Sequence, residues 1–290
     1  MRNFLIATNF IKDDNLIFTS KIEHYISTHG GSCKKIIGET DAPDSSGDIS
    51  YKLEKEEIFD CIIALGGDGT ILKVSRDLRD MNIPIVGVNL GTLGFLTEIE
   101  PDQIFPVIDR LLTDDYEMEE RMNISGAIFK EGAGTVPYKD VALNDIVVTR
   151  AGFSRVIGLK VYLNGKVMDI YEADGVIIST PTGSTGYNLS AGGPIVSPKT
   201  NLIIVTPISP HSLTSKSIVL SSEDEIMIEV LKMRKAQKEE AIVSFDGQSG
   251  TQLSAGDRIV IGKACSVTRM IKLFDVSFYE VLREKITNHL

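Results

Sequence analysis

The segment Leu65–Thr70, with the sequence Leu-Gly-Gly-Asp-Gly-Thr, restricts the possible folds of this chain more than any other segment. It follows the apolar run 59–64, which is typical of a buried parallel strand, and it precedes residues 71–76, which have the pattern of a helix start. Glycines let a backbone approach a phosphate closely, and the first turn of a helix offers unpaired N–H groups and a positive dipole end. The order of strand, glycine turn and helix therefore predicts a phosphate site.

A carboxylate in the middle of this turn needs a chemical reason, because a negative charge repels phosphate. Asp68 could act as a general base toward a hydroxyl group, or it could contact magnesium. Alternatively, the segment is only a tight turn between strand and helix, and Asp68 is the N-cap of the helix. The turn by itself leaves these interpretations open.

The N-terminal part of the chain alternates between apolar runs and helical patterns. Strands are predicted at 4–7, 35–37, 59–64 and 84–88, and helices at about 15–29, 70–80 and 101–113, with loop composition over 38–50. This alternation predicts an α/β, Rossmann-like domain with a parallel, doubly wound sheet. Ligands bind such sheets beyond the carboxyl ends of the strands, where the turn at 66–70 and a second glycine-bearing turn at 89–95 are expected.

The pattern changes near residue 116 to short strand-like runs. These runs cover 123–129, 142–150, 156–163, 175–179, 201–206, 217–220, 225–230, 242–246 and 258–261. Asn164-Gly165 is a two-residue hairpin signal. We therefore predict a Rossmann-like nucleotide-phosphate domain at 1–115 and a β-rich domain of the β-sandwich type at 116–275. A helix at about 276–290 is expected to pack back on the first domain.

Composition excludes several functional classes. The 290 residues are 42% hydrophobic and 24% charged, which predicts a folded chain with a proper core. The net charge of −10 argues against partners such as nucleic acid or an anionic membrane, and no apolar run reaches transmembrane length. The three scattered cysteines and four histidines match no metal motif, and the cysteines favour a reduced, cytoplasmic location.

The segment 174–194 holds the densest group of candidate ligand-binding residues. An apolar run ends there in a block of glycines and hydroxyl side chains, which can present many small donors to a phosphorylated or sugar-bearing ligand. Tyr187 is the one large flat side chain in the block and suits stacking on a base. The alternative is a flexible loop. Asn144-Asp145 places two polar side chains at the start of a strand, where a plain turn is the alternative.

With these segments in hand, the chain resembles the NAD kinase family. The resemblance rests on 66–70, Asn144-Asp145 and 174–194, and also on 87–95, 207–213 and 245–248. It implies transfer of the ATP γ-phosphoryl group to the 2′-hydroxyl of the adenosine ribose of NAD, giving NADP and ADP. It also implies a Rossmann-like N-terminal domain and a β-rich C-terminal domain.

The resemblance implies roles for individual residues. Asp68 is the catalytic base that accepts the 2′-hydroxyl proton. The residues implied to bind the phosphates of ATP or the dinucleotide are Gly67, Gly69, Thr70, Lys73, Asn144, Asp145, Arg155, Asp174, Thr185, Gly186, Tyr187, Asn188, Leu189, Ser190 and Gln248. The chain departs from the family pattern at Asp145, where Glu is usual, at Gly186, where Ala is common, and at Glu172, which replaces a basic residue of some members.

The resemblance also implies cofactors and assembly. A divalent cation, Mg²⁺, is expected to arrive with ATP and to be held largely by its phosphates, so no dedicated metal ligand is predicted. Members of the family form homodimers and homotetramers. A lipid kinase shares residues 66–70, but the −10 charge and the polar block at 183–190 argue against a lipid substrate. A non-catalytic NAD-binding regulator predicts loss of Asp68 or of the glycine turn, and both are intact.

Overall fold

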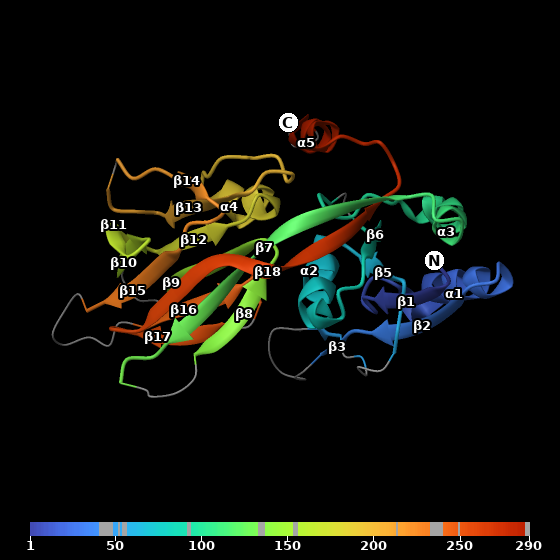
Figure 1. Ribbon diagram of the computed structural model, residues 1–290, viewed down its shortest axis with the longest axis horizontal. Helices are drawn as coiled ribbons and strands as arrows, with labels where there is room; N and C mark the ends of the chain where they lie inside the picture. Colours follow the sequence, from blue (N-terminus) through green and yellow to red (C-terminus); the bar gives the residue numbers. More distant parts are fainter. Residues whose placement is uncertain are drawn as a thin grey trace. The chain divides into compact units, whose positions relative to one another are not determined.

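The computed structural model describes residues 1–40, 49–51, 53, 57–91, 94–132, 137–152, 156–212, 214–232, 240–248 and 250–287. The chain forms two compact units (Figure 1). Unit 1 comprises Met1–Arg121 and Thr268–Leu290, and unit 2 comprises Met122–Val267. Two strands, β7 (Glu117–Phe129) and β18 (Arg258–Lys272), have residues in both units.

Unit 1 is built on a parallel sheet. Its strands lie in the order β2 (Ser32–Ile37), β1 (Asn3–Thr8), β5 (Cys61–Gly66) and β6 (Ile85–Asn89), and the end of β18 pairs parallel with β6. The parallel sheet confirms the predicted Rossmann-like architecture. The short strands β3 (Glu39–Thr40) and β4 (Ile49–Ser50) pair antiparallel inside the segment that has loop composition.

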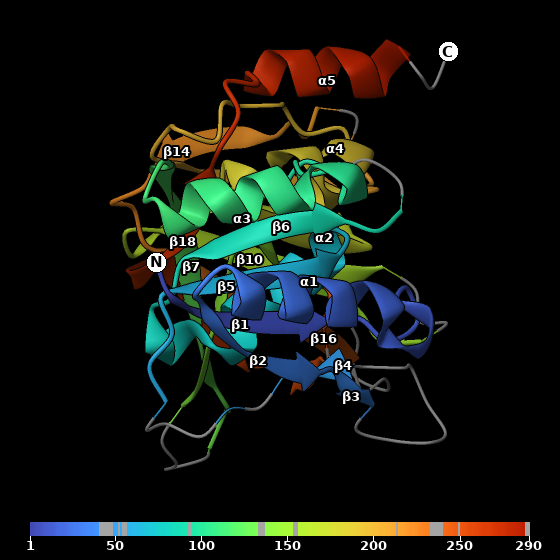
Figure 2. The same ribbon diagram turned by 90° about the vertical axis from the view of Figure 1, so that its right-hand side faces the viewer.

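Helices cover both faces of this sheet. α1 (Ile17–Thr28) and α3 (Ile104–Leu112) contact each other and bury one apolar face with alternate strand residues, among them Phe4, Ile63 and Val86 (Figure 2). α2 (Asp68–Asp77) packs on β5 and β6 from the other face. The remaining helical elements are η1 (Asp14–Leu16), η2 (Arg79–Met81), η3 (Pro101–Gln103) and α5 (Phe278–Thr287).

Unit 2 contains two sheets around one core. The first has the order β11 (Lys166–Ala173), β10 (Ile157–Leu163), β15 (Ile226–Leu231) and β18, with β7 pairing β8 (Tyr138–Ala142). The second has the order β14 (Ile218–Ser221), β13 (Leu202–Ile208), β12 (Gly175–Ser179), β9 (Asp145–Arg150), β16 (Glu240–Phe245) and β17 (Thr251–Ser254). Buried residues of both sheets form a single hydrophobic cluster, which confirms the predicted β-sandwich type.

Several elements differ from the sequence-based expectation. β8, β11 and β17 were not predicted, and β18 continues to Lys272 instead of ending near 261. β11 is an edge strand whose side chains are mostly exposed, so it lacks the apolar alternation that marks a half-buried strand. The hairpin before it is present, with Asn164 and Gly165 both at positive φ. None of the described helices is long and apolar enough to cross a membrane.

Candidate functional site

The glycine turn of unit 1 lies at the carboxyl edge of the parallel sheet. The fully buried strand β5 ends at Gly66, whose carbonyl accepts a hydrogen bond from Leu90 N–H at 2.6 Å. Gly67 is the N-cap of α2, and Thr70 N–H donates to the Gly67 carbonyl at 2.9 Å. The helix therefore begins at Asp68, two residues before the predicted start, and the glycine turn presents the N-terminus of α2.

The carboxylate of Asp68 is held by the loop that follows β6. Oδ2 accepts the backbone N–H of Phe95 at 2.7 Å, and Oδ1 accepts those of Leu96 at 3.0 Å and Thr97 at 3.2 Å, together with the Thr97 hydroxyl at 3.3 Å. Asp68 is thus not the N-cap of α2, and its described hydrogen bonds come from another loop. Because a carboxylate oxygen can accept about two hydrogen bonds, the second lone pair of Oδ2 has no donor among the described residues.

Gly94 makes room for this arrangement. A Cβ at position 94 would lie 1.8 Å from Asp68 Oδ1, so any side chain there would displace the carboxylate. The second glycine turn therefore lets the loop approach Asp68 closely enough for its amides to hold both oxygens. The sequence pattern alone did not distinguish this role from simple turn chemistry.

A cavity of about 420 Å³ opens beside Asp68. It is lined by Asn9, Lys12, Tyr51, Gly67, Asp68, Gly69, Thr70, Lys73, Gly94 and Lys285. Three of these residues are lysines. Of the three, only Lys73 was predicted from the sequence as a phosphate-binding residue. Lys12 Nζ lies 3.0 Å from the position that a Cβ would take on Gly67. Cationic side chains and a helix N-terminus together make the cavity suitable for a phosphorylated ligand.

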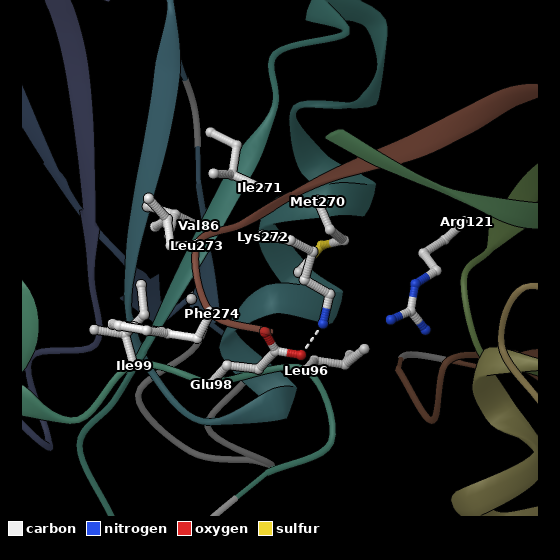
Figure 3. A pocket seen from close by; sticks show the side chains of 11 residues that line it. Val86, Leu96, Glu98, Ile99, Arg121, Met270, Ile271, Lys272, Leu273 and Phe274 are labelled. Atoms are coloured by element: carbon white, nitrogen blue, oxygen red, sulfur yellow. Dashed lines mark ion pairs between the residues drawn. The ribbon is translucent and has the colours of Figure 1, made fainter. Parts of the chain in front are cut away.

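A half-buried ion network ties the Asp68 loop to the parts of β7 and β18 that belong to unit 1. Lys272 pairs with Glu98 and lies 3.6 Å from Glu119, which in turn lies 3.2 Å from Arg121. Figure 3 shows the side chains of Lys272 and Arg121 pointing into the same pocket. Because Glu98 follows Thr97 directly, the Lys272–Glu98 pair fixes the end of the loop whose amides hold Asp68.

Lys272→Met is expected to lower the free energy of unfolding by about 1–2 kcal/mol. The change leaves the Glu98 carboxylate without this partner at a side-chain exposure of only 16%, although residual exposure keeps the cost below that of a fully buried pair. Urea denaturation measures the loss. Lys263→Met removes a lysine from an exposed pair with Glu223 and should cost much less. Equal losses for the two variants would contradict the anchoring role.

In unit 2, two of the predicted clusters are brought together. Thr180 N–H donates to the Asn144 carbonyl at 2.8 Å, and the Thr180 hydroxyl donates to the Leu143 carbonyl at 2.6 Å. Asn144 Nδ2 lies 3.5 Å from the position that a Cβ would take on Gly186. The start of β9 and the block after β12 therefore form one site.

Gly183→Ala is expected to destabilise unit 2 by about 1–3 kcal/mol. A Cβ at position 183 would lie 2.1 Å from the backbone carbonyl oxygen of Asn144, so the two segments must separate. Thermal unfolding of the variant measures the loss. Gly262→Ala is the matched control, since a Cβ there meets nothing within 4 Å. A Gly183→Ala protein as stable as Gly262→Ala would show that this close approach is not required.

Asp145 and Asp246 place two carboxyl groups at the same site. Asp246 accepts backbone N–H groups from Leu143 at 2.9 Å, Asn144 at 2.7 Å and Asp145 at 3.1 Å, so its turn orients the start of β9. Burial, reinforced by the charge of Asp246, raises the pKa of Asp145 to about 7. Gln248 follows on the same turn, where its N–H donates to the Phe245 carbonyl.

The Asn144 side chain has an unsatisfied acceptor at this site. Its Oδ1 is buried and has no hydrogen-bond partner in the part of the chain that the structure describes. Such an orphaned acceptor in a native protein calls for an explanation, and a ligand hydroxyl is the natural donor.

The other predicted residues lie mainly on two short helices after β12. Thr185 belongs to η4 (Thr182–Thr185), and Tyr187, Asn188, Leu189 and Ser190 form α4 (Tyr187–Ser190), so the alternative of a flexible loop does not hold for these residues. Tyr187 and Ser190 line a cavity of about 450 Å³, and Tyr187 is 45% exposed. A flat, accessible ring of this kind can stack on a base.

Three predicted residues need separate description. The Asn188 amide is fully buried: Nδ2 donates to the carbonyls of Ser184 and Pro194, and Oδ1 accepts the Thr206 hydroxyl, so this side chain holds the block together. Asp174 accepts a hydrogen bond from Arg150 Nε at 2.7 Å at the start of β12. Arg155 lies outside the described residues.

Comparisons with known proteins agree over the whole chain. Residues 6–116 match the model of the ATP-NAD kinase N-terminal domain, and residues 143–273 match that of the ATP-NAD kinase C-terminal domain. The chain is 46% identical to NAD kinase from Lachnoclostridium phytofermentans over 98% of this chain and 99% of the relative, and 44% identical to NAD kinase from Agathobacter rectalis over the full length of both.

Solved structures agree with these matches. An NAD kinase from Archaeoglobus fulgidus in complex with ATP aligns with a TM-score of 0.74 and 28% identity, covering 99% of each chain. Yeast NADH kinase complexed with NADH aligns with a TM-score of 0.81 over 99% of this chain and 88% of that one; at 24% identity, this similarity supports the fold.

Proposed function

Because the chain belongs to the ATP-NAD kinase family, we propose that it transfers the γ-phosphoryl group of ATP to the 2′-hydroxyl of the adenosine ribose of NAD, forming NADP and ADP. One structural observation gives the main chemical support for this reaction. A carboxylate, Asp68, is oriented by three backbone amides beside a lysine-lined cavity at a helix N-terminus. Phosphoryl transfer needs this combination of positioned acceptor and cationic surroundings.

Unit 1 is proposed to hold the phosphates of ATP. Gly67 and Gly69 would provide backbone N–H groups at the start of α2, Thr70 would contribute its hydroxyl, and Lys73 would provide a cation one turn later. Asp68 would act as the base. Its Oδ2 has the lone pair without a described donor, so this oxygen is the one to accept the 2′-hydroxyl proton.

Unit 2 is proposed to bind NAD. The orphaned Asn144 Oδ1 suits a ribose hydroxyl, and Asp145 adds a second acceptor when it is ionised. Tyr187 would stack on the adenine. The remaining residues proposed to contact the dinucleotide are Arg155, Asp174, Thr185, Gly186, Asn188, Leu189, Ser190 and Gln248. For Asn188 the described bonds of the side chain are internal, which favours contact through its backbone.

A divalent cation, Mg²⁺, is proposed to enter with ATP. No group of three or more acidic, histidine or cysteine side chains suited to a metal occurs among the described residues. Oxygen atoms of the phosphates would supply most of its coordination, and Asp68 is a carboxylate that lines the cavity. The cation would neutralise charge on the transferred group.

The direct test is formation of NADP from NAD and Mg-ATP, detected with an NADP-specific dehydrogenase. Such an enzyme responds to the 2′-phosphate, so it also tests the position of transfer. Omission of the divalent cation should abolish the signal. A wild-type protein that binds NAD but forms no NADP would contradict the proposed activity and favour a non-catalytic regulator.

Assembly through unit 2 and a cytoplasmic location are further parts of the proposal. The edge strand β11 exposes Val167 and Ile170, and the edge strand β14 exposes Val219, so unit 2 offers apolar side chains at the edges of both sheets. These edges support a homodimer or homotetramer, which light scattering on the purified protein can measure. All three cysteines are free thiols, which fits a reducing compartment.

A further inference from the structure

The last described helix, α5, brings a lysine to the cavity beside Asp68. Lys285 is one of the cavity-lining residues, although it comes from the opposite end of the chain. Its neighbours in the lining include Lys12, from the loop after β1, and Lys73, from α2. Three separate segments of unit 1 therefore each contribute one ammonium group to the same cavity.

Two residues of α5 contact the same aromatic ring of unit 1. The Phe278 ring lies 6.2 Å from the Phe95 ring, and Lys285 Nζ lies over the same ring at 4.3 Å from its centroid. No described residue of α5 belongs to the buried core cluster of this unit, and Tyr279 is 69% exposed. α5 therefore rests on Phe95 without deep burial, which permits its side chains to adjust when a ligand binds.

Phe95 also contacts the proposed base. Its backbone N–H donates to Asp68 Oδ2 at 2.7 Å, which is the oxygen assigned to accept the substrate proton. Phe95 therefore contacts both side chains: its backbone N–H orients Asp68, and its ring contacts Lys285. Through Phe95, α5 lies close to the carboxylate of Asp68 although it is far away in the sequence.

The charges of the cavity favour a change of partner for Lys285. An ammonium group over the half-buried Phe95 ring makes a weaker interaction than a charge-assisted hydrogen bond to phosphate. A nucleoside triphosphate adds several negative charges next to Asp68, which itself repels them. Cations beyond the helix dipole are needed to offset that repulsion.

We propose that Lys285 turns from the Phe95 ring to bind the phosphates of ATP, which makes α5 part of the phosphoryl-donor site. This inference rests on the proposed function, since it assumes that the cavity beside Asp68 holds the donor. It assigns a substrate-binding role to the C-terminal helix that the motifs of the sequence did not indicate.

The test compares Lys285→Gln, Lys285→Arg and Arg283→Gln with the wild type. Arg283 lies on the same helix and is exposed, and it does not line the cavity, so its change removes one charge as a matched control. Circular dichroism checks the fold of each variant. Binding of a non-hydrolysable ATP analogue is measured by calorimetry without NAD, and KM values for ATP and NAD are measured in the NADP assay.

We expect Lys285→Gln to weaken binding of the analogue and to raise KM for ATP by about tenfold, the usual effect of losing one charge-assisted hydrogen bond. KM for NAD should stay within about twofold, Lys285→Arg should recover most of the loss, and Arg283→Gln should match the wild type. Binding by Lys285→Gln within about twofold of wild type, or an equal loss in Arg283→Gln, would overturn the inference.

The two proposals fail in different ways. If the wild type forms NADP and Lys285→Gln binds the analogue normally, the role of Lys285 is wrong and the proposed function stands. If the wild type forms no NADP while Lys285→Gln still weakens binding of the analogue, the donor site stands and the proposed reaction is wrong.

Discussion

Asp68→Asn is expected to lower kcat for NADP formation by about 10²–10⁴-fold while binding of NAD stays within about threefold of wild type. The amide keeps the size of the side chain but cannot take up the hydroxyl proton, and positioned general bases contribute rate factors of this order. Most of the proposed contacts with NAD come from unit 2, so the substitution alters only the contact of residue 68 with the 2′-hydroxyl. Steady-state kinetics and calorimetric titration with NAD measure the two effects.

The same substitution also disturbs the loop that holds residue 68. The carboxylate accepts donors on both oxygens, whereas an Asn side chain can offer only one oxygen and must turn its NH₂ group toward N–H donors. This mismatch should lower the free energy of unfolding by about 1–3 kcal/mol. A fall in kcat could then arise from a displaced loop instead of a missing base.

Thr97→Val separates the two causes. It removes the hydroxyl that donates to Asp68 Oδ1 at 3.3 Å and keeps the carboxylate and the backbone amides. We expect Thr97→Val to lower kcat by less than about tenfold, because the net loss is a single hydrogen bond. If kcat of Thr97→Val falls as far as kcat of Asp68→Asn, a displaced loop accounts for the loss of activity. If Asp68→Asn retains most of its activity, Asp68 is not the base.

The position of the glycine turn could be predicted from sequence because the signal is local. Strand 59–64, the glycines and the helix start are adjacent in the chain, and strand periodicity and helix N-terminus rules apply directly to them. The carboxyl ends of parallel strands meet at one edge, so the second glycine turn was correctly placed near the first.

The partners of Asp68 could not be predicted in the same way. Its hydrogen bonds come from backbone amides at 95–97, and backbone amides leave no mark on the sequence. Lys12 lies in the turn just after β1, which ends at Thr8, so the rule on carboxyl ends could have found it. Lys285 had no such signal, because only the fold brings α5 to the cavity.

In unit 2 the sequence pattern predicted the position of the site but not its short helices or the raised pKa of Asp145. The block after residue 174 was recognised from its composition, yet its short helices η4 and α4 were not, because four-residue helices have no detectable period. The closeness of Asp145 and Asp246 depends on β9 pairing with β16, two strands separated by most of unit 2. A raised pKa at Asp145 therefore follows from the fold and not from any local motif.

Asp145→Asn is expected to stabilise the protein at neutral and alkaline pH while weakening NAD binding. The pKa of Asp145 rises from 3.8 to about 7, so between these values the folded protein keeps a proton that the unfolded chain has released. Stability therefore falls as pH rises through this window, and the full cost is present above pH 7. A shift of about three pKa units at about 1.4 kcal/mol each gives an upper limit of ~4 kcal/mol for the stability lost when Asp145 ionises.

Asn resembles the protonated acid in size and stays neutral at every pH. Urea denaturation should show the variant more stable than the wild type by about 2–4 kcal/mol at pH 8, and the difference should shrink toward zero near pH 4. Asp169→Asn, at an exposed position of the same unit, is the control. Its free energy of unfolding, compared with wild type, should not show this dependence on pH. An Asp145→Asn protein that is no more stable than wild type at pH 8 would show that Asp145 is not strained by burial.

The activity of the same variant connects this cost to the proposed function. If the ionised carboxylate accepts a hydrogen bond from NAD, Asp145→Asn should raise KM for NAD by about tenfold with little effect on KM for ATP. A gain in stability together with a loss of NAD affinity is the pattern expected where a protein keeps an unfavourable buried charge for its ligand. A gain in stability with unchanged KM for NAD would remove Asp145 from the NAD site and leave Asn144 as the acceptor there.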